Sequence, residues 1–231
     1  MKVRVKFRKF GAIKFVGHLD LLRYFQKAMR RADIPIAFSG GYSPHMIMSF
    51  AHPLGVGLTS EGDYFDIELT EPISSREAVE RLNKVMVEGT EVVSFTAIPE
   101  EKKCAGMSIV TAADYHSSLK TGELPDDYRD LAERFFAQPE IIILKQTKRS
   151  EQMVDIKPMI YRFQGRDHGF FMSVATGSAQ NLKPDLVMKA FLRSAGWPED
   201  NMIFQYHRLE TYADGADGNL IPLEKLGWEI L

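Results

Sequence analysis

Residue types that support chemistry gather near the start of this 231-residue chain. Gly17-His18-Leu19-Asp20 opens a helical stretch, and the loop Ser39-Gly40-Gly41-Tyr42-Ser43-Pro44-His45 follows it. His18 and His45 are candidates for a general acid and base, because imidazole titrates near neutral pH. Paired glycines adopt positive φ angles and let a backbone approach a ligand or anion closely. We therefore expect the functional site in this region.

Four side chains of this region, His18, Asp20, His45 and His52, are of types that bind metals or form acid–base pairs. Their spacing matches no metal-binding motif, so we predict no metal in this chain. A structural explanation serves equally well for part of the set, since an aspartate in the first turn of a helix is stabilised by the helix dipole.

A row of basic side chains marks one face of the helix predicted over residues 18–32. Cations spaced three and four residues apart share a helix face and can contact successive phosphates. A solvated helix face explains the same pattern, and the i,i+3 pair Asp20–Arg23 favours that explanation. Residues 1–50 hold ten Lys or Arg against two Asp, a net charge of 10 − 2 = +8, although the whole chain carries −2. The predicted nucleic-acid-binding residues are Lys14, Arg23, Lys27, Arg30 and Arg31.

A second glycine-rich segment runs from Pro53 to Gly62 and contains Gly55-Val56-Gly57 followed by Ser60-Glu61. A single Gly-x-Gly is not specific, and a β-bulge or hairpin explains it as well as a ligand does. The residues predicted to contact a ligand or partner are His18, Asp20, Ser39, Gly41, Tyr42, Ser43, His45, Gly57, Ser60 and Glu61.

The composition excludes several classes of protein. A single cysteine, Cys104, rules out an internal disulfide, a four-cysteine zinc site and a three-cysteine iron–sulfur motif within this chain. The overall charge of −2 argues against a wholly basic nucleic-acid binder, although a local basic patch remains possible. No apolar stretch is long enough to span a bilayer, so we expect a cytoplasmic protein without a membrane partner.

The hydrophobic periodicity predicts an α+β fold. Val3, Val5 and Phe7 alternate with charged residues, which is typical of a strand with one buried face. Ser74 and Glu77 form a capping box at the start of a second helix, which we expect to end at Gly89. The other elements predicted in this half are strands at 34–38, 46–50, 64–69 and 90–98.

The second half repeats this order of elements. Its predicted strands are 107–119, 140–147, 154–163, 170–175 and 202–212, and its predicted helices are 126–137 and 184–195. The order predicts two tandem ferredoxin-like (βαββαβ) units with antiparallel sheets. We place the first domain at residues 1–99 and the second at 105–213, with a C-terminal tail at 214–231 that contains Ala-Asp-Gly-Ala-Asp-Gly.

Basic residues of the second half are interpreted as structural. An inward-facing Arg208 would need a carboxylate, and Asp155 is the candidate partner. Lys145, Lys148 and Arg149 precede this aspartate in the chain.

Four segments in a fixed order resemble the bacterial family called the radical-SAM-linked domain of unknown function. They are Gly17-His18-Leu19-Asp20, Arg30-Arg31-Ala32 with Pro35, the Ser39–His45 loop, and Pro53 to Asp66. Asp63 stands where that family more often has Glu, and Ser43 where Asn is common. Asp155-Ile156-Lys157-Pro158 and His207-Arg208 resemble weaker later motifs, so the resemblance spans nearly the whole chain.

This resemblance implies an accessory protein of a radical-SAM enzyme, with a genetic association to a ribonuclease and a ribosomal protein. The iron–sulfur cluster and S-adenosylmethionine would belong to the partner, because this chain has no cluster-binding cysteines. We expect RNA binding or substrate presentation without catalysis. An RNA-processing nuclease using His18 or His45, and a protein-interaction module that binds no RNA, are the alternatives.

Overall fold

The computed structural model describes residues 1–146, 151–199 and 201–231. The chain forms two compact units, which we call unit 1 (Met1–Thr111 and Arg208–Leu231) and unit 2 (Ala112–His207). The fold is α+β, with a large, mostly antiparallel sheet and few helices. The sequence predicts a division at residues 99–105, whereas the compact units change over at 111/112 and 207/208.

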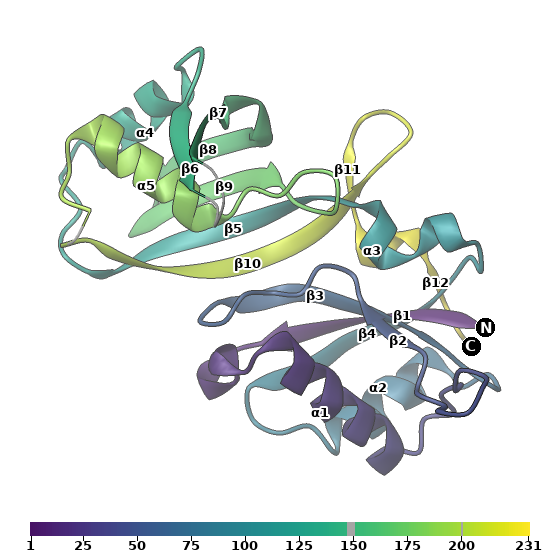
Figure 1. Ribbon diagram of the computed structural model, residues 1–231. Coiled ribbons are helices and arrows are strands. Elements are labelled where there is room, and N and C mark those ends of the chain that lie inside the picture. The colour runs from purple at the N-terminus through teal and green to yellow at the C-terminus, as the bar shows by residue number, and fades with distance from the viewer. Residues whose placement is uncertain (147–150, 200) are drawn as a thin grey trace. The chain divides into compact units, whose positions relative to one another are not determined.

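Unit 1 begins with a βαββαβ order of elements. The strands follow the order β4-β1-β3, with β2 paired to β3, and the pairs β1–β3, β1–β4 and β2–β3 are antiparallel. Helices α1 and α2 cover one face of these strands (Figure 1). The elements are β1 (Lys2–Lys9), the 3-10 helix η1 (Gly11–Phe15), α1 (His18–Arg31), β2 (Met48–Phe50), β3 (Thr59–Glu68), α2 (Ser75–Asn83) and β4 (Thr90–Ile98).

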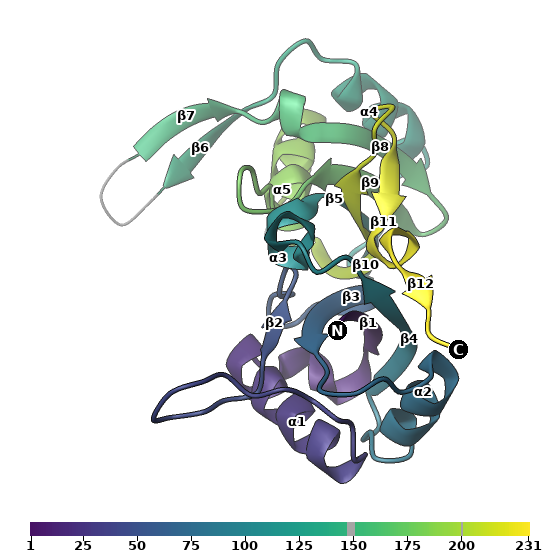
Figure 2. The same cartoon turned by 90° about the vertical axis from the view of Figure 1, so that its right-hand side faces the viewer.

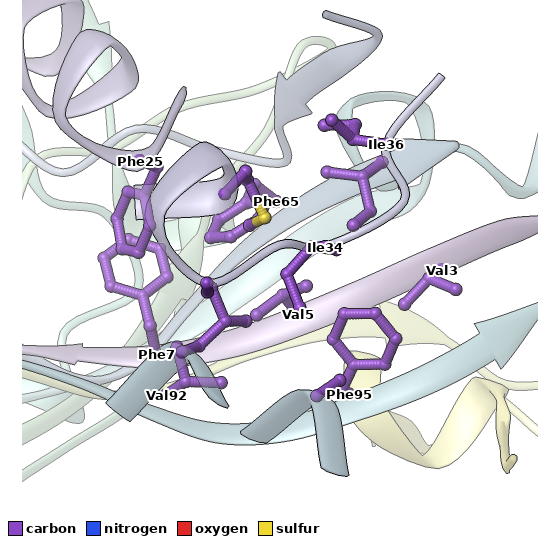
Figure 3. Close-up of a cluster of buried hydrophobic side chains, with 14 of the residues drawn as sticks. Val3, Val5, Phe7, Phe25, Ile34, Ile36, Phe65, Val92 and Phe95 are labelled. Carbon is purple, nitrogen blue, oxygen red and sulfur yellow. The ribbon is translucent and has the colours of Figure 1, made fainter. Parts of the chain in front are cut away.

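An apolar core attaches α1 to the sheet (Figure 3). Val3, Val5 and Phe7 are fully buried, as the alternation in β1 predicts. The Phe25 ring of α1 lies with its centroid 4.8 Å from that of Phe7 and 4.7 Å from that of Phe65 on β3. Aromatic rings packed at such distances contribute both buried area and favourable edge contacts. The opposite face of α1 therefore points to solvent.

The C-terminal segment completes unit 1. The last part of β10 (Ile203–Asp214) pairs with β11 (Leu220–Pro222), and β12 (Trp228–Glu229) pairs with β4. The 3-10 helix η4 (Leu223–Leu226) lies between them and contains the fully buried Leu223. The segment predicted as a separate tail at 214–231 thus forms part of the unit, because its backbone pairs with two strands of that unit.

Unit 2 holds a second group of antiparallel strands in the order β5-β9-β8, with β10 beside β5. Its core contains four packed rings, of which Phe163 and Phe170 are stacked: Phe135, Phe163, Phe170 and Phe191. Figure 2 shows β6 and β7 as a separate two-stranded hairpin of this unit. The elements are β5 (Val110–Thr121), α4 (Tyr128–Phe136), β6 (Ile142–Gln146), β7 (Glu151–Asp155), β8 (Ile160–Arg166), β9 (Gly169–Ala175) and α5 (Pro184–Ala195).

Several predicted elements differ from the observed ones. Residues 34–38 form two isolated bridges rather than a strand, and Pro35 in that segment has no N–H to donate to a ladder. The strand predicted at 154–163 is interrupted by the 3-10 helix η3 (Lys157–Met159), which contains Pro158. Residues 102–109 form the 3-10 helix η2 (Lys102–Cys104) and the short helix α3 (Gly106–Ile109) before β5 starts. The strand predicted at 140–147 ends at residue 147, outside the described residues.

Gly89 is required where the chain enters β4, although α2 itself ends at Asn83. Its φ angle is +99°, and a Cβ there would lie 2.6 Å from Ile13 Cγ1 and 2.8 Å from the Phe10 carbonyl oxygen. We expect Gly89→Ala to lower the free energy of unfolding by about 2–4 kcal/mol, measured by urea denaturation, because strain and overpacking add. Gly40→Ala is the control, since a Cβ there has nothing within 4 Å. Equal stability of the two variants would contradict this explanation.

Candidate nucleic-acid interface

Three of the ten early cations are buried and do not reach solvent. Arg4 forms two hydrogen bonds with Asp66, Nε–Oδ1 at 2.8 Å and Nη2–Oδ2 at 2.9 Å. Lys6 Nζ lies 2.7 Å from Glu210 and 3.0 Å from Glu224. Lys9 is also fully buried. The charge of +8 counted along the sequence therefore overstates the exposed positive field.

The cations of α1, by contrast, are exposed. Arg23 Nη1 lies 3.1 Å from Asp20 Oδ1, and such an exposed pair contributes little to stability. Arg31 donates to the Val85 carbonyl at 3.1 Å. Within the part of the chain that the structure describes, no carboxylate lies within 4.0 Å of Lys27 or Arg30. These side chains are available to anions in solution.

Exposed apolar side chains surround the start of α1. Phe10, Phe15 and Leu19, which we call the apolar rim, are 41%, 66% and 59% exposed. Lys14 Nζ lies 5.2 Å from the centroid of the Phe15 ring. The Lys14 carbonyl accepts from Gly57 N at 2.8 Å, so the second glycine-rich segment lies beside this rim. Cations next to exposed aromatic rings are the side-chain set that binds single-stranded nucleic acid.

The Ser39–His45 loop is closed by its own two ends. Ser39 Oγ lies 2.8 Å from His45 Nδ1, and Ser39 N donates to the His45 carbonyl at 2.8 Å. Gly41 has a φ angle of +97°, as paired glycines predict. Tyr42 and Ser43 at the tip are exposed. The loop thus presents a tyrosine ring to solvent, and its contact with a ligand or partner stays a prediction.

The structure does not bring His18 and His45 together. His18 begins α1 near Gly57, just before β3 starts, whereas the Ser39–His45 loop is tied to the other end of β3 through the Phe38–Met46 and Met48–Ile67 pairs. A ten-residue strand spans about 33 Å. Within the described residues, no three His, Cys, Asp or Glu side chains are grouped to hold a metal.

Ser60 and Glu61, both predicted to contact a ligand, make internal contacts. Ser60 is 1% exposed and accepts from Gly62 N at 3.0 Å. Glu61 pairs with Arg8 Nε at 2.5 Å. Gly57 has a φ angle of +90° in the turn before them. These contacts give the three residues a structural role.

Arg208 is buried as predicted, but its partner is different. The guanidinium contacts Asp63 of β3 and donates to the His52 carbonyl at 3.0 Å. Asp155 instead accepts from the backbone N–H groups of Ile141 and Lys157, both at 2.9 Å. Lys148, Arg149 and the side chain of Lys145 lie outside the part of the chain that the structure describes.

His52 provides a prediction for pH dependence. Burial and the Arg208 charge lower the pKa of His52 to about 4, against about 6.5 in an unfolded chain. Between these values the unfolded state binds a proton that the folded state does not, so stability falls as pH drops from 6.5 to 4. We expect His52→Gln to remove up to about 3 kcal/mol of this loss, measured by urea denaturation at pH 7 and pH 4.5. Identical pH dependence in both proteins would refute the assignment.

Over residues 2–184 the sequence matches a family described as an uncharacterized protein conserved in bacteria (DUF2344). The chain belongs to this family. No curated protein matches it. A solved structure titled "Crystal Structure of a Cbf5-Nop10-Gar1 Complex" is similar at 12% identity and a TM-score of 0.45, over 97% of this chain and 61% of that chain. A likeness at this level says nothing about what this chain binds.

No described helix is both long and apolar enough to cross a membrane.

Proposed function

We propose that this protein binds single-stranded RNA, without catalysis of its own, as an accessory partner of a radical-SAM modification enzyme. The observation that carries RNA binding is the row Arg23, Lys27 and Arg30 on the exposed face of α1. The radical-SAM partner follows from the sequence resemblance alone. The iron–sulfur cluster and S-adenosylmethionine would belong to that partner, and a cytoplasmic location goes with the proposal.

The physical support is the combination of charge and rings along α1. The 14-residue helix is about 21 Å long, with the apolar rim at its start and Tyr42 in the loop that follows its end. Cations contact phosphates along a strand, while bases stack on exposed rings without regard to sequence. Solvated cations alone would need no exposed phenylalanines beside them.

Phe15 tests the stacking component. We expect Phe15→Ala to weaken binding of a single-stranded oligonucleotide about 5- to 150-fold, because stacking of one base contributes about 1–3 kcal/mol. Fluorescence anisotropy measures the affinity. Tyr161→Ala is the matched control, since that ring is 47% exposed in unit 2. An equal loss in both variants would show that the rim has no specific role.

A protein-interaction module is the second candidate, and the apolar rim favours it, because an exposed apolar cluster also marks protein contacts. Co-purification of the tagged chain from its host distinguishes the two. Recovery of one RNA class together with a radical-SAM enzyme would support the proposal. Protein partners without RNA above background would favour the module.

A nuclease using His18 and His45 together has less support, because the two side chains lie near opposite ends of β3. If the protein is a nuclease that uses one of these histidines alone, RNA cleavage should be lost in either His18→Ala or His45→Ala. Our proposal predicts no cleavage in the unmodified protein.

We also propose that each unit is a ferredoxin-like variant. The support in unit 1 is the order β4-β1-β3-β2 for a βαββαβ chain, and in unit 2 the order β10-β5-β9-β8 around α4 and α5. The hairpin β6–β7 would then be an insertion in the second unit.

A further inference from the structure

Lys9 is a buried cation without a carboxylate partner. It is 0% exposed, and its Nζ donates to the Val16 carbonyl at 3.0 Å. None of the described residues places a carboxylate within 4.0 Å of this nitrogen. Burial, together with the charge of Arg208, lowers the pKa of Lys9. The fold thus holds this ammonium group where water does not reach it.

Arg208 is the second buried cation, and it is only partly satisfied. Its side chain is 1% exposed, and one terminal nitrogen contacts Asp63 and the His52 carbonyl. Its Nε and Nη1 atoms are buried and have no hydrogen-bond partner. Buried donors without acceptors are rare in folded proteins and cost free energy.

In the part of the chain that the structure describes, one carboxylate contacts this pair of cations, and the next acidic side chains, Glu210 and Glu224, are shared with Lys6. Asp63 is the one carboxylate that contacts either cation among the described residues. Glu210 is occupied, because it accepts from Lys6, from the Tyr64 hydroxyl at 2.7 Å and from Thr211 N at 2.8 Å. The lowered pKa of His52 keeps that ring neutral at pH 7. Water could satisfy the free donors, but an oxyanion accepts shorter and stronger hydrogen bonds from cationic donors.

We propose that Lys9 and Arg208 of unit 1 form a binding site for a single oxyanion of the phosphate class. Such an anion accepts hydrogen bonds from Lys9 Nζ and from the free N–H groups of Arg208, and it places a negative charge directly against both cations. Ser60, which is the register partner of Lys9 across β1 and β3, lies beside the site. Since both cations are buried, the anion exchanges slowly with solvent. The site does not depend on RNA binding by α1.

The direct test measures binding of inorganic phosphate to the full chain by equilibrium dialysis, at constant ionic strength with chloride as the competing anion. The unmodified protein should bind about one phosphate. At a phosphate concentration tenfold above Kd, its Tm should rise by about 3–6 °C. Lys9→Met should weaken phosphate binding at least about tenfold, whereas Lys84→Gln, an exposed lysine of unit 1 outside α1, should leave it unchanged.

Asp63→Asn provides the sharper variant, because it removes the carboxylate that competes with the anion while keeping an acceptor for Arg208. We expect this change to tighten phosphate binding at least about tenfold. Arg208→Gln should abolish binding; if that variant does not fold, Lys9→Met and Asp63→Asn decide the question.

The proposal is overturned if phosphate and chloride act alike on the unmodified protein, or if Lys9→Met binds phosphate normally. Competition between a 5′-phosphorylated mononucleotide and inorganic phosphate would identify a nucleotide as the source of the group. Phosphate binding without such competition would identify the free ion. Loss of RNA binding in α1 variants with phosphate binding intact would leave this site standing.

Discussion

Replacing Arg23, Lys27 and Arg30 together by glutamate is expected to lower the affinity for single-stranded RNA about 100-fold or more at 0.1 M salt. Each lost phosphate contact removes about 0.7 from the slope of log affinity against log salt, so three contacts reduce the slope by about 2. The introduced carboxylates repel the phosphates further. Filter binding or anisotropy over a salt series measures both quantities.

The control for this charge reversal is a second triple variant of unit 1. Arg76, Lys84 and Lys225 are exposed cations outside α1, and their replacement by glutamate changes the net charge equally. We expect this control to reduce the affinity only through the general field, with little change in the salt slope. Equal effects of the two variants would mean that α1 is a solvated face and that the charge row has no binding role. Circular dichroism should show both variants folded.

Arg4→Met is expected to destabilise the protein by about 3–5 kcal/mol, measured by urea denaturation. The change leaves the Asp66 carboxylate buried, with Gly106 N still donating to it at 2.6 Å. Removing one partner of a buried ion pair is costly because the other charge stays uncompensated. Arg4 also donates to the Cys104 carbonyl at 2.8 Å, so the loss extends to the segment that precedes β5.

A double-mutant cycle with Asp66→Asn checks the origin of this effect. The two changes together should cost less than the sum of the single changes, because Asn leaves no unpaired charge. Arg76→Met is the exposed control: its pair with Glu80 is 4.0 Å long, and we expect a change within about 0.5 kcal/mol. If the losses of unfolding free energy in Arg4→Met and Asp66→Asn simply add in the double variant, the two side chains do not act as a pair.

Local patterns allowed much of the fold to be predicted from the sequence. The helix α5 begins at Pro184 and ends at Ala195 before Gly196, as the proline and glycine signals indicate. The N-cap half of the capping box is present, with Ser74 Oγ accepting from Glu77 N at 3.3 Å, while the Glu77 carboxylate pairs with Arg81. Strand β4 covers Thr90–Ile98, the predicted range. Each of these signals lies within a few residues of the element that it determines.

The buried ion pairs could not be predicted in this way. Alternation in β1 placed Arg4 and Lys6 on a polar face, and a polar face usually points to water. Their partners Asp66, Glu210 and Glu224 are between 62 and 218 residues away along the chain. The register of β1 against β3 brings Asp66 to Arg4, and the return of the chain after unit 2 brings Glu210 and Glu224 to Lys6. Periodicity carries no information about either.

The candidate interface was predicted in part. The spacing of Arg23, Lys27 and Arg30 predicts a common helix face, and the structure leaves these side chains exposed. The sequence cannot predict that His18 and His45 lie near opposite ends of β3, because their separation depends on the register of β2 against β3. The exposed ring of Phe15 was also missed, since a phenylalanine in a sequence is first expected to be buried.

The discontinuity of unit 1 has a consequence for translation. Lys6 leaves the ribosome 218 residues before Glu224, a delay of roughly 10–40 s at ordinary elongation rates. During this time the nascent first half cannot neutralise Lys6, while unit 2, which is continuous in the chain, is synthesised completely. We expect the inserted unit to mature before the unit that encloses it, so that chaperones that bind nascent chains engage the N-terminal half. A premature stop codon after residue 207 would therefore leave unit 1 incomplete, without the carboxylates that neutralise Lys6.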